Sequence, residues 1–259
     1  MTSATVETAG VALAFEERGE GAPSVVLVHG IAGDRSVWRE TLALLDSRTI
    51  AYDRRAHGES GAPEPYGGTT VGEQADDLAS LVRATEAAPA VLCGHGFGAL
   101  VCLDVMLRFP ELARAAVLIE PPMLWLSPAG SEAMSEMREA VEQGARDGGG
   151  AGAVDAYLGP ALEVLGPERA GAARDAIAGF AADLGAIASW SAGRRELRAI
   201  EQPVAVVAGT QSPPVNAEVA RAVVDLLPNG GLVELDAGHY AQIERPADVA
   251  AEVTRIASA

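Results

Sequence analysis

The segment Gly94-His95-Gly96-Phe97-Gly98 lies between two apolar stretches, Ala90–Cys93 before it and Phe97–Phe109 after it. A short apolar run that ends at glycine is typical of a strand buried on both faces of a parallel sheet. The second stretch is long enough to form a helix, and closely spaced glycines allow two backbones to approach each other through a sharp turn. This segment therefore predicts a buried strand, a tight turn and a helix.

The same alternation continues on both sides of this segment. Thr70 and Glu73 have the spacing of a capping box and predict a helix start, followed by a helical pattern of apolar residues. Further short apolar runs predict strands at Ser24–Val28, Thr49–Tyr52, Ala116–Ile119, Val204–Ala208 and Leu232–Leu235. Strands that alternate with helices predict an α/β fold with a mostly parallel central sheet flanked by helices.

The strand pattern disappears between residues 121 and 200. Helical stretches remain there, interrupted by glycine and proline at Gly159-Pro160 and Gly166-Pro167. We therefore expect residues 1–120 and 201–259 to form one core and residues 121–200 to form a helical cap inserted into it. The glycine- and alanine-rich residues 144–153 are expected to be a flexible connection within this cap.

The composition restricts the classes of partner and the compartment. A chain of 259 residues with 49% hydrophobic residues is long enough for one α/β domain, and its net charge of −17 would repel nucleic acid and anionic membranes. The first residues lack a basic patch followed by an apolar core, so we expect a cytoplasmic protein. Cys93 and Cys102 both lie in apolar runs, which excludes a disulfide framework.

The glycine-rich turn has a chemical meaning beyond its shape. Its strand–turn–helix context is that of the pattern G-x-S-x-G, and it matches this pattern except that Gly96 replaces the serine. A dinucleotide-binding loop is the structural alternative, but G-x-G-x-x-G is not met from either Gly94 or Gly96. The segment thus favours a catalytic turn without its usual nucleophile, and no cofactor is expected.

Three other motifs occur in a matching order. They are Val28-His29-Gly30-Ile31 at a strand end, Asp53–Ser60, which is similar to D-x-R-G-x-G-x-S, and Gly238-His239 followed by Glu244-Arg245-Pro246. With the G-x-S-x-G-like turn, they make the chain resemble the α/β-hydrolase family over essentially its whole length. It departs from the family pattern at Ala56, where glycine is usual, and at Gly96.

This resemblance implies roles for individual residues. Gly96 occupies the nucleophile position, and His239 is the expected catalytic base. The commonest position of the family's acid falls on Ser212, which has no carboxylate, whereas Glu120 directly follows the predicted strand Ala116–Ile119. Some haloalkane dehalogenases and the zearalenone-lactonase group carry their acid at this place, and the chain is similar to them there. We therefore predict that Glu120 orients His239, with Asp236 as the alternative partner.

The resemblance also places an oxyanion hole at the backbone N–H groups of Ile31 and Phe97. Losing a side chain at position 96 would leave these donors present. A metal site is not expected, because the four histidines all lie in turn motifs and none has the spacing of common metal sites.

Several large side chains of the cap are candidates for lining an apolar substrate pocket, although such residues often serve only to pack helices. They are Met123, Trp125, Tyr157, Phe180 and Trp190. Arg54 and Arg55 could recognise an anionic group, but pairing with carboxylates or exposure to solvent is the favoured interpretation.

Three functions are compatible with this pattern. The first is an ester or lactone hydrolase in which glycine has replaced the nucleophile serine. The second is a natural enzyme in which Glu120 and His239 act as an acid/base dyad, catalysing elimination, cyclisation, C–C cleavage or attack by water. The third is a ligand-binding protein without turnover. In each case the expected partner is a small hydrophobic molecule that contains a carbonyl group, and a homodimer is a candidate assembly.

Overall fold

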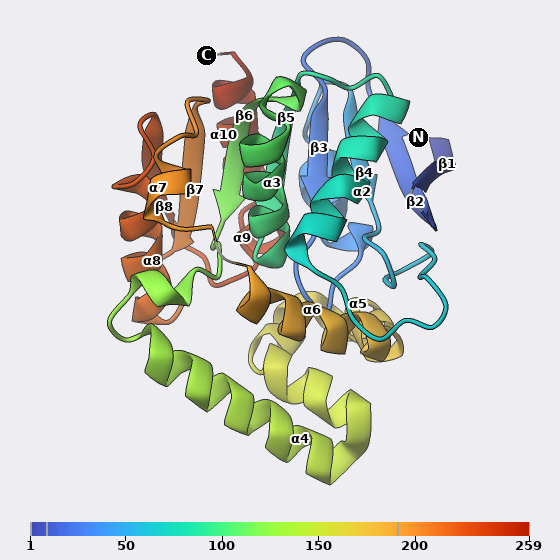
Figure 1. Ribbon diagram of the computed structural model, residues 1–259, viewed down its shortest axis with the longest axis vertical. Helices are drawn as coiled ribbons and strands as arrows, with labels where there is room; N and C mark the ends of the chain where they lie inside the picture. Colours follow the sequence, from blue (N-terminus) through green and yellow to red (C-terminus); the bar gives the residue numbers. More distant parts are fainter. Residues whose placement is uncertain (1, 9, 191, 259) are drawn as a thin grey trace.

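The computed structural model describes residues 2–8, 10–190 and 192–258, which contain an eight-stranded sheet in the order β1-β2-β4-β3-β5-β6-β7-β8 (Figure 1). The strands β3 to β8 run parallel, whereas β1 pairs with β2, and β2 with β4, in the antiparallel sense. The strands are β1 (Thr2–Thr8), β2 (Val11–Arg18), β3 (Val25–Val28), β4 (Thr49–Tyr52), β5 (Ala90–His95), β6 (Ala113–Ile119), β7 (Val204–Gly209) and β8 (Gly230–Leu235). The α/β fold and the mostly parallel sheet predicted from the sequence are confirmed.

Helices cover both faces of the sheet because its central strands are apolar on both sides. Every residue of β3, β4, β5 and β7 is buried. Helices α2 and α3 cover the face toward the viewer in Figure 1, and α10 packs on the other face beside α1. The helices of the core are α1 (Arg39–Leu42), α2 (Val71–Ala84), α3 (Phe97–Arg108), α8 (Pro214–Val224), α9 (Ala241–Glu244) and α10 (Pro246–Ala257).

Helix α2 begins where the sequence predicts it. The Thr70 hydroxyl accepts from the Glu73 N–H at 3.0 Å, and the Glu73 carboxylate accepts from the Thr70 N–H at 2.8 Å. These reciprocal bonds form a capping box and satisfy two backbone donors that lack helical partners. Helix α8 begins at Pro214, because proline is well suited to the first position of a helix.

Residues 121–200 form helices in the part that the structure describes, and these lie beyond the carboxyl ends of the parallel strands (Figure 1). The cap helices are α4 (Gly130–Leu158), α5 (Ala161–Asp175) and α6 (Ile177–Ser189), followed by the short α7 (Arg194–Leu197). Within the described residues, no helix is both long and apolar enough to cross a membrane.

Helix α4 is a hairpin of two arms rather than one straight helix. The backbone leaves the helical conformation at Gly148 and Gly149, where the second of these has a φ of 63°. On the two arms, a β-carbon at Gly144 would lie 2.2 Å from the carbonyl oxygen of Gly152. The glycine-rich stretch is therefore a closely packed turn and not the flexible connection expected from its composition, because the missing side chains let the arms touch.

Candidate active site

The turn between β5 and α3 has the backbone geometry predicted for it. Gly96 has φ 52° and ψ −119°, a conformation that L-residues with side chains rarely adopt. The flanking glycines are required by close packing, since a β-carbon at Gly94 would lie 2.5 Å from the Gly98 oxygen. A β-carbon at Gly98 would lie 2.3 Å from the oxygen of Val28. The turn thus presents residue 96 at the carboxyl end of the central strands.

His239 and Glu120 meet next to this turn. Nδ1 of His239 donates to Oε2 of Glu120 at 2.6 Å, so the contact predicted from the sequence is confirmed. The alternative acid, Asp236, instead accepts from Arg245 and Gln211. Glu120 follows β6 with a positive φ of 46°, an uncommon conformation for a residue with a side chain. Its carboxylate is buried, whereas 35% of the His239 side chain is exposed.

Two further donors hold the Glu120 carboxylate. The Gly209 N–H donates to Oε1 at 2.9 Å, and Nδ2 of Asn216 donates to Oε2 at 2.6 Å. Burial acts to raise the pKa of Glu120, but the hydrogen bond and charge of His239 lower it, and the net pKa lies below its ordinary value. Glu120 is therefore an anion at neutral pH. The sequence did not predict the contact of Asn216 with Glu120, because no motif spacing singles out a residue of α8.

The other nitrogen of the His239 ring lies toward Gly96. A β-carbon at Gly96 would be 3.7 Å from Nε2, with the Gly30 Cα as the next residue at 3.9 Å. The His95 ring lies 4.5 Å from the His239 ring, and Nε2 of His95 donates to the His239 carbonyl oxygen at 3.1 Å. His239, the turn and the strand-end residue Gly30 thus converge on one point.

Ile31 and Phe97 directly follow Gly30 and Gly96, the two glycines that meet at this point. Ile31 is buried in the turn after β3. Phe97 is the first residue of α3, where a backbone N–H has no acceptor within the helix. Their assigned role as oxyanion donors stays a prediction.

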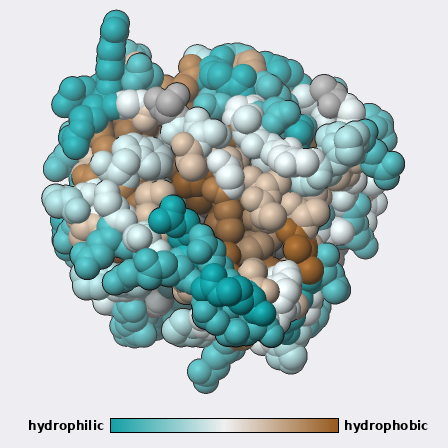
Figure 2. Space-filling model, turned by 60° about the horizontal axis from the view of Figure 1, so that its bottom comes forward, coloured by the Kyte–Doolittle hydropathy of each residue, from teal (hydrophilic) through white to brown (hydrophobic). Residues whose placement is uncertain are grey.

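A cavity of about 820 Å³ opens beside His239. It lies between the cap helices α4 and α5 on one side and the loops after β7 and β8 on the other. Its walls include Asn216, Tyr157, Val164 and Ser212, and mostly apolar side chains complete them. Figure 2 shows the cap end of the molecule, where apolar surface gathers in a central hollow bordered by polar residues.

Only one of the five large side chains proposed to line a pocket borders this cavity. Tyr157 does so, and Phe180 packs edge-on against its ring at 5.4 Å. Met123 is fully buried, while Trp125 and Trp190 border a different surface pocket. The prediction is therefore corrected to Tyr157 for this cavity, because the other four serve to pack the cap or lie outside it.

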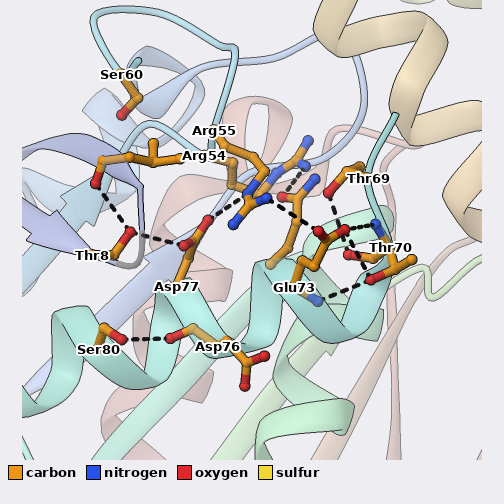
Figure 3. A network of polar contacts seen from close by, with 12 residues as sticks. Thr8, Arg54, Arg55, Ser60, Thr69, Thr70, Glu73, Asp76, Asp77 and Ser80 are labelled. Carbon is orange, nitrogen blue, oxygen red and sulfur yellow. Dashed lines mark hydrogen bonds and ion pairs between the residues drawn. The ribbon is translucent and has the colours of Figure 1, made fainter. Parts of the chain in front are cut away.

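Arg54 and Arg55 are paired with carboxylates, as the sequence favoured. Arg54 contacts Asp183 at 2.6 Å, and Nε of Arg55 donates to Asp77 at 2.7 Å. Asp77 accepts from the Thr8 hydroxyl as well, so the second pair joins the loop after β4 to α2 and β1 (Figure 3). Both arginines are buried and are therefore withdrawn from recognition of a free anion. Among the described residues, no group of three or more His, Cys, Asp or Glu side chains could hold a metal ion.

Similar proteins are hydrolases of several kinds. A 2-(acetamidomethylene)succinate hydrolase of Mesorhizobium japonicum is 32% identical over 159 residues, which are 60% of this chain and 54% of that protein. The match thus spans about half the length of that relative. An epoxide hydrolase of Caballeronia sordidicola is 30% identical over 53% of this chain and 42% of its own.

A solved structure extends the likeness to almost the whole chain. A thermophilic esterase from Thermogutta terrifontis has 26% identity and a TM-score of 0.79, covering 98% of this chain and 97% of the esterase. The family model described as "Alpha/beta hydrolase family" matches residues 25–252, from the first parallel strand into the last helix. This chain therefore belongs to the alpha/beta hydrolase family.

Proposed function

We propose that this protein hydrolyses a hydrophobic ester or lactone with Glu120 and His239, and that water takes the place of a side-chain nucleophile at position 96. The observation that carries the proposal is the geometry around Nε2 of His239. Glu120 holds the opposite ring nitrogen at 2.6 Å, and the nearest approach of a β-carbon at Gly96 would still be 3.7 Å. At this position a water molecule would take the place that the hydroxyl group of a serine at position 96 would occupy.

The proposed reaction needs no covalent intermediate. Glu120 keeps the proton on Nδ1, so Nε2 carries the lone pair that accepts a proton from water. The water oxygen forms a bond to the carbonyl carbon, and the N–H groups of Ile31 and Phe97 stabilise the resulting oxyanion. When the C–O bond breaks, Nε2 returns its proton to the departing alkoxide.

The cavity supports an uncharged apolar substrate. Its volume of about 820 Å³ lies near the upper end of the usual range for ligand pockets. Glu136 and Glu244 border it, and the residues that line it in the described part of the chain include neither lysine nor arginine. The relative from Mesorhizobium is named for a succinate, and such a dianion would find no cationic partner in this wall. We therefore favour long-chain esters or macrolactones.

The test is hydrolysis of aryl esters from acetate to decanoate, and of macrolactones, followed by intact-protein mass spectrometry during turnover. We expect a preference for long acyl chains, no acyl adduct on the protein, and loss of turnover in His239→Gln. Asp236→Asn is the matched control, because Asp236 belongs to the same loop but its carboxylate accepts from Gln211 and Arg245. An acyl adduct, or equal turnover in the His239→Gln variant, would refute the water mechanism.

A second candidate is a serine hydrolase in which glycine replaces the nucleophile. The backbone geometry of Gly96 favours it, because the turn keeps a φ of 52°, which a residue with a side chain adopts only under strain and mostly at functional sites. Non-hydrolytic acid/base chemistry and ligand binding without turnover remain as outcomes of the same assays. Binding of long-chain amides without hydrolysis of any ester would support binding alone.

A further inference from the structure

Arg54 lies at the centre of a buried network that the proposed reaction does not use. Only 1% of its surface is exposed, and its guanidinium has five N–H donors. All five are used, in bonds to the His29 oxygen (2.9 Å), the Gly30 oxygen (2.8 Å), Gln74 Oε1 (2.7 Å), Asp183 Oδ1 (3.1 Å) and Asp183 Oδ2 (2.6 Å). A planar group bonded in this way has a single orientation.

Two of these bonds hold the backbone that leads to the proposed oxyanion hole. The carbonyl of Gly30 and the N–H of Ile31 belong to the same planar peptide group, so fixing the oxygen also fixes the direction of the N–H. Nε2 of His29 accepts from the Arg54 N–H at 2.9 Å, and its Nδ1 donates to the Gly30 oxygen at 2.8 Å. Burial lowers the pKa of His29, which agrees with this neutral form of the ring.

The same arginine contacts the residue that carries the other proposed donor. The guanidinium carbon of Arg54 lies 4.8 Å from the centroid of the Phe97 ring. This distance is typical of a cation–π interaction. Arg54 therefore touches both residues whose N–H groups are assigned to the oxyanion.

The remaining bonds connect Arg54 to the cap. Asp183 belongs to α6 and is completely buried, and its Oδ1 also accepts from Nε2 of Gln74 at 2.8 Å. Helix α6 lies directly against the loop after β4, since a β-carbon at Gly179 would be 2.5 Å from the Ala56 oxygen. Ala56 is the residue at which this loop departs from the family pattern.

We propose that Arg54 is a positioning residue, which together with Asp183 couples the docking of cap helix α6 to the orientation of the Gly30–Ile31 peptide. This inference rests on the proposed function, because it takes the Ile31 and Phe97 N–H groups as the oxyanion site. A buried ion pair often contributes little net stability compared with apolar residues, so a role in orientation accounts for its presence in this place.

The test compares the binding of two ligands to Asp183→Asn by calorimetry. One is a monoalkyl octylphosphonate, which is anionic and tetrahedral like the intermediate, and the other is N-ethyloctanamide, which is neutral. In the variant, the asparagine amide has one acceptor oxygen in place of two. If that oxygen stays between Arg54 and Gln74, the new NH2 group faces an Arg54 N–H donor, and the 2.6 Å bond to Asp183 Oδ2 is lost. The arginine thereby loses its fixed orientation. We expect the phosphonate to bind about tenfold more weakly or worse, with amide binding little changed.

Charge alone predicts the opposite result, because removing the negative charge of Asp183 would strengthen the binding of an anion. Glu40→Gln is the matched control. It breaks the 2.6 Å ion pair of Glu40 with Arg169, which also joins a cap helix to the core but does not contact the oxyanion backbone. We expect this control to leave the affinity ratio of the two ligands unchanged.

Equal losses for both ligands, or unchanged phosphonate binding in Asp183→Asn, would overturn the inference. If that variant does not fold, the double variant Arg54→Met/Asp183→Leu replaces the pair with apolar residues, and the same selective loss is expected. If the parent protein binds the amide but not the phosphonate, the oxyanion site itself is wrong, and the proposed function fails together with the inference.

Discussion

Asn216 donates to Oε2 of Glu120 at 2.6 Å, the same oxygen that accepts from His239. Helix α8 thus supports the candidate acid at the same oxygen that His239 contacts. Because Asn216 also borders the cavity, a change at this position affects both the Glu120 carboxylate and the cavity wall.

Asn216→Asp is expected to move the acidic limb of the pH profile upward. Two carboxylates within hydrogen-bond distance share a proton, so the pKa of Glu120 would rise and its ionised form would disappear at a higher pH. The measurement is kcat/KM against pH, with Asn216→Ala as the control that removes the amide without adding charge. An unchanged acidic limb in the aspartate variant would show that Glu120 takes no part in the reaction.

Glu120→Gln is expected to lower kcat by about 10³- to 10⁴-fold, the loss seen when the acid of such an arrangement becomes an amide. The variant should also change stability with pH. The folded-state pKa of Glu120 is lowered, so its ionised form stabilises the fold above its ordinary pKa, and this stabilisation is lost as the pH falls through the folded-state value. Thermal melts should therefore differ most near neutral pH and converge in acid. A constant difference would contradict the assignment.

Gly96→Ser separates the two candidate mechanisms. The serine must adopt a φ of 52°, a strain of about 1–3 kcal/mol, although its β-carbon meets no atom nearer than 3.7 Å. If glycine replaces a serine of an active hydrolase, ester turnover should rise sharply with a burst of acyl-enzyme. If water is the nucleophile, the hydroxyl occupies its space and the native reaction falls. Gly96→Ala has the same strain without the hydroxyl, so a burst in both variants would exclude serine chemistry.

Gly152→Ala is expected to loosen the α4 hairpin. The added β-carbon would lie 2.3 Å from the Gly144 oxygen, so the two arms must separate, at a cost of about 1–3 kcal/mol. Limited proteolysis and amide hydrogen exchange of α4 measure this effect. Gly148→Ala is the control, because a β-carbon there meets nothing within 4 Å. Equal protection of α4 in both variants would show that the close approach of Gly144 and Gly152 does not stabilise the hairpin.

Local sequence determined much of the fold. Apolar runs such as Thr49–Tyr52 are buried on both faces and became strands as predicted, because burial on both sides requires continuous apolar residues. The Thr70–Glu73 capping box and the glycines around position 96 also act within a few residues, where spacing alone decides the hydrogen bonds or the turn. The pairing of Glu120 with His239 followed from motif order and from the missing carboxylate at Ser212.

Only the tertiary structure decided which distant side chains line the same cavity and which form hydrogen bonds or ion pairs with each other. Asn216 contacts Glu120, and Asp183 contacts Arg54, because α8 and α6 pack against the ends of the strands. No local sequence pattern predicts these contacts. Cap residues such as Trp125 are apolar in the sequence whether they face the cavity or another surface, so packing alone assigned Tyr157 to the cavity. Local patterns specify elements through short-range sterics and hydrogen bonds, whereas contacts across more than a hundred residues depend on how the helices dock.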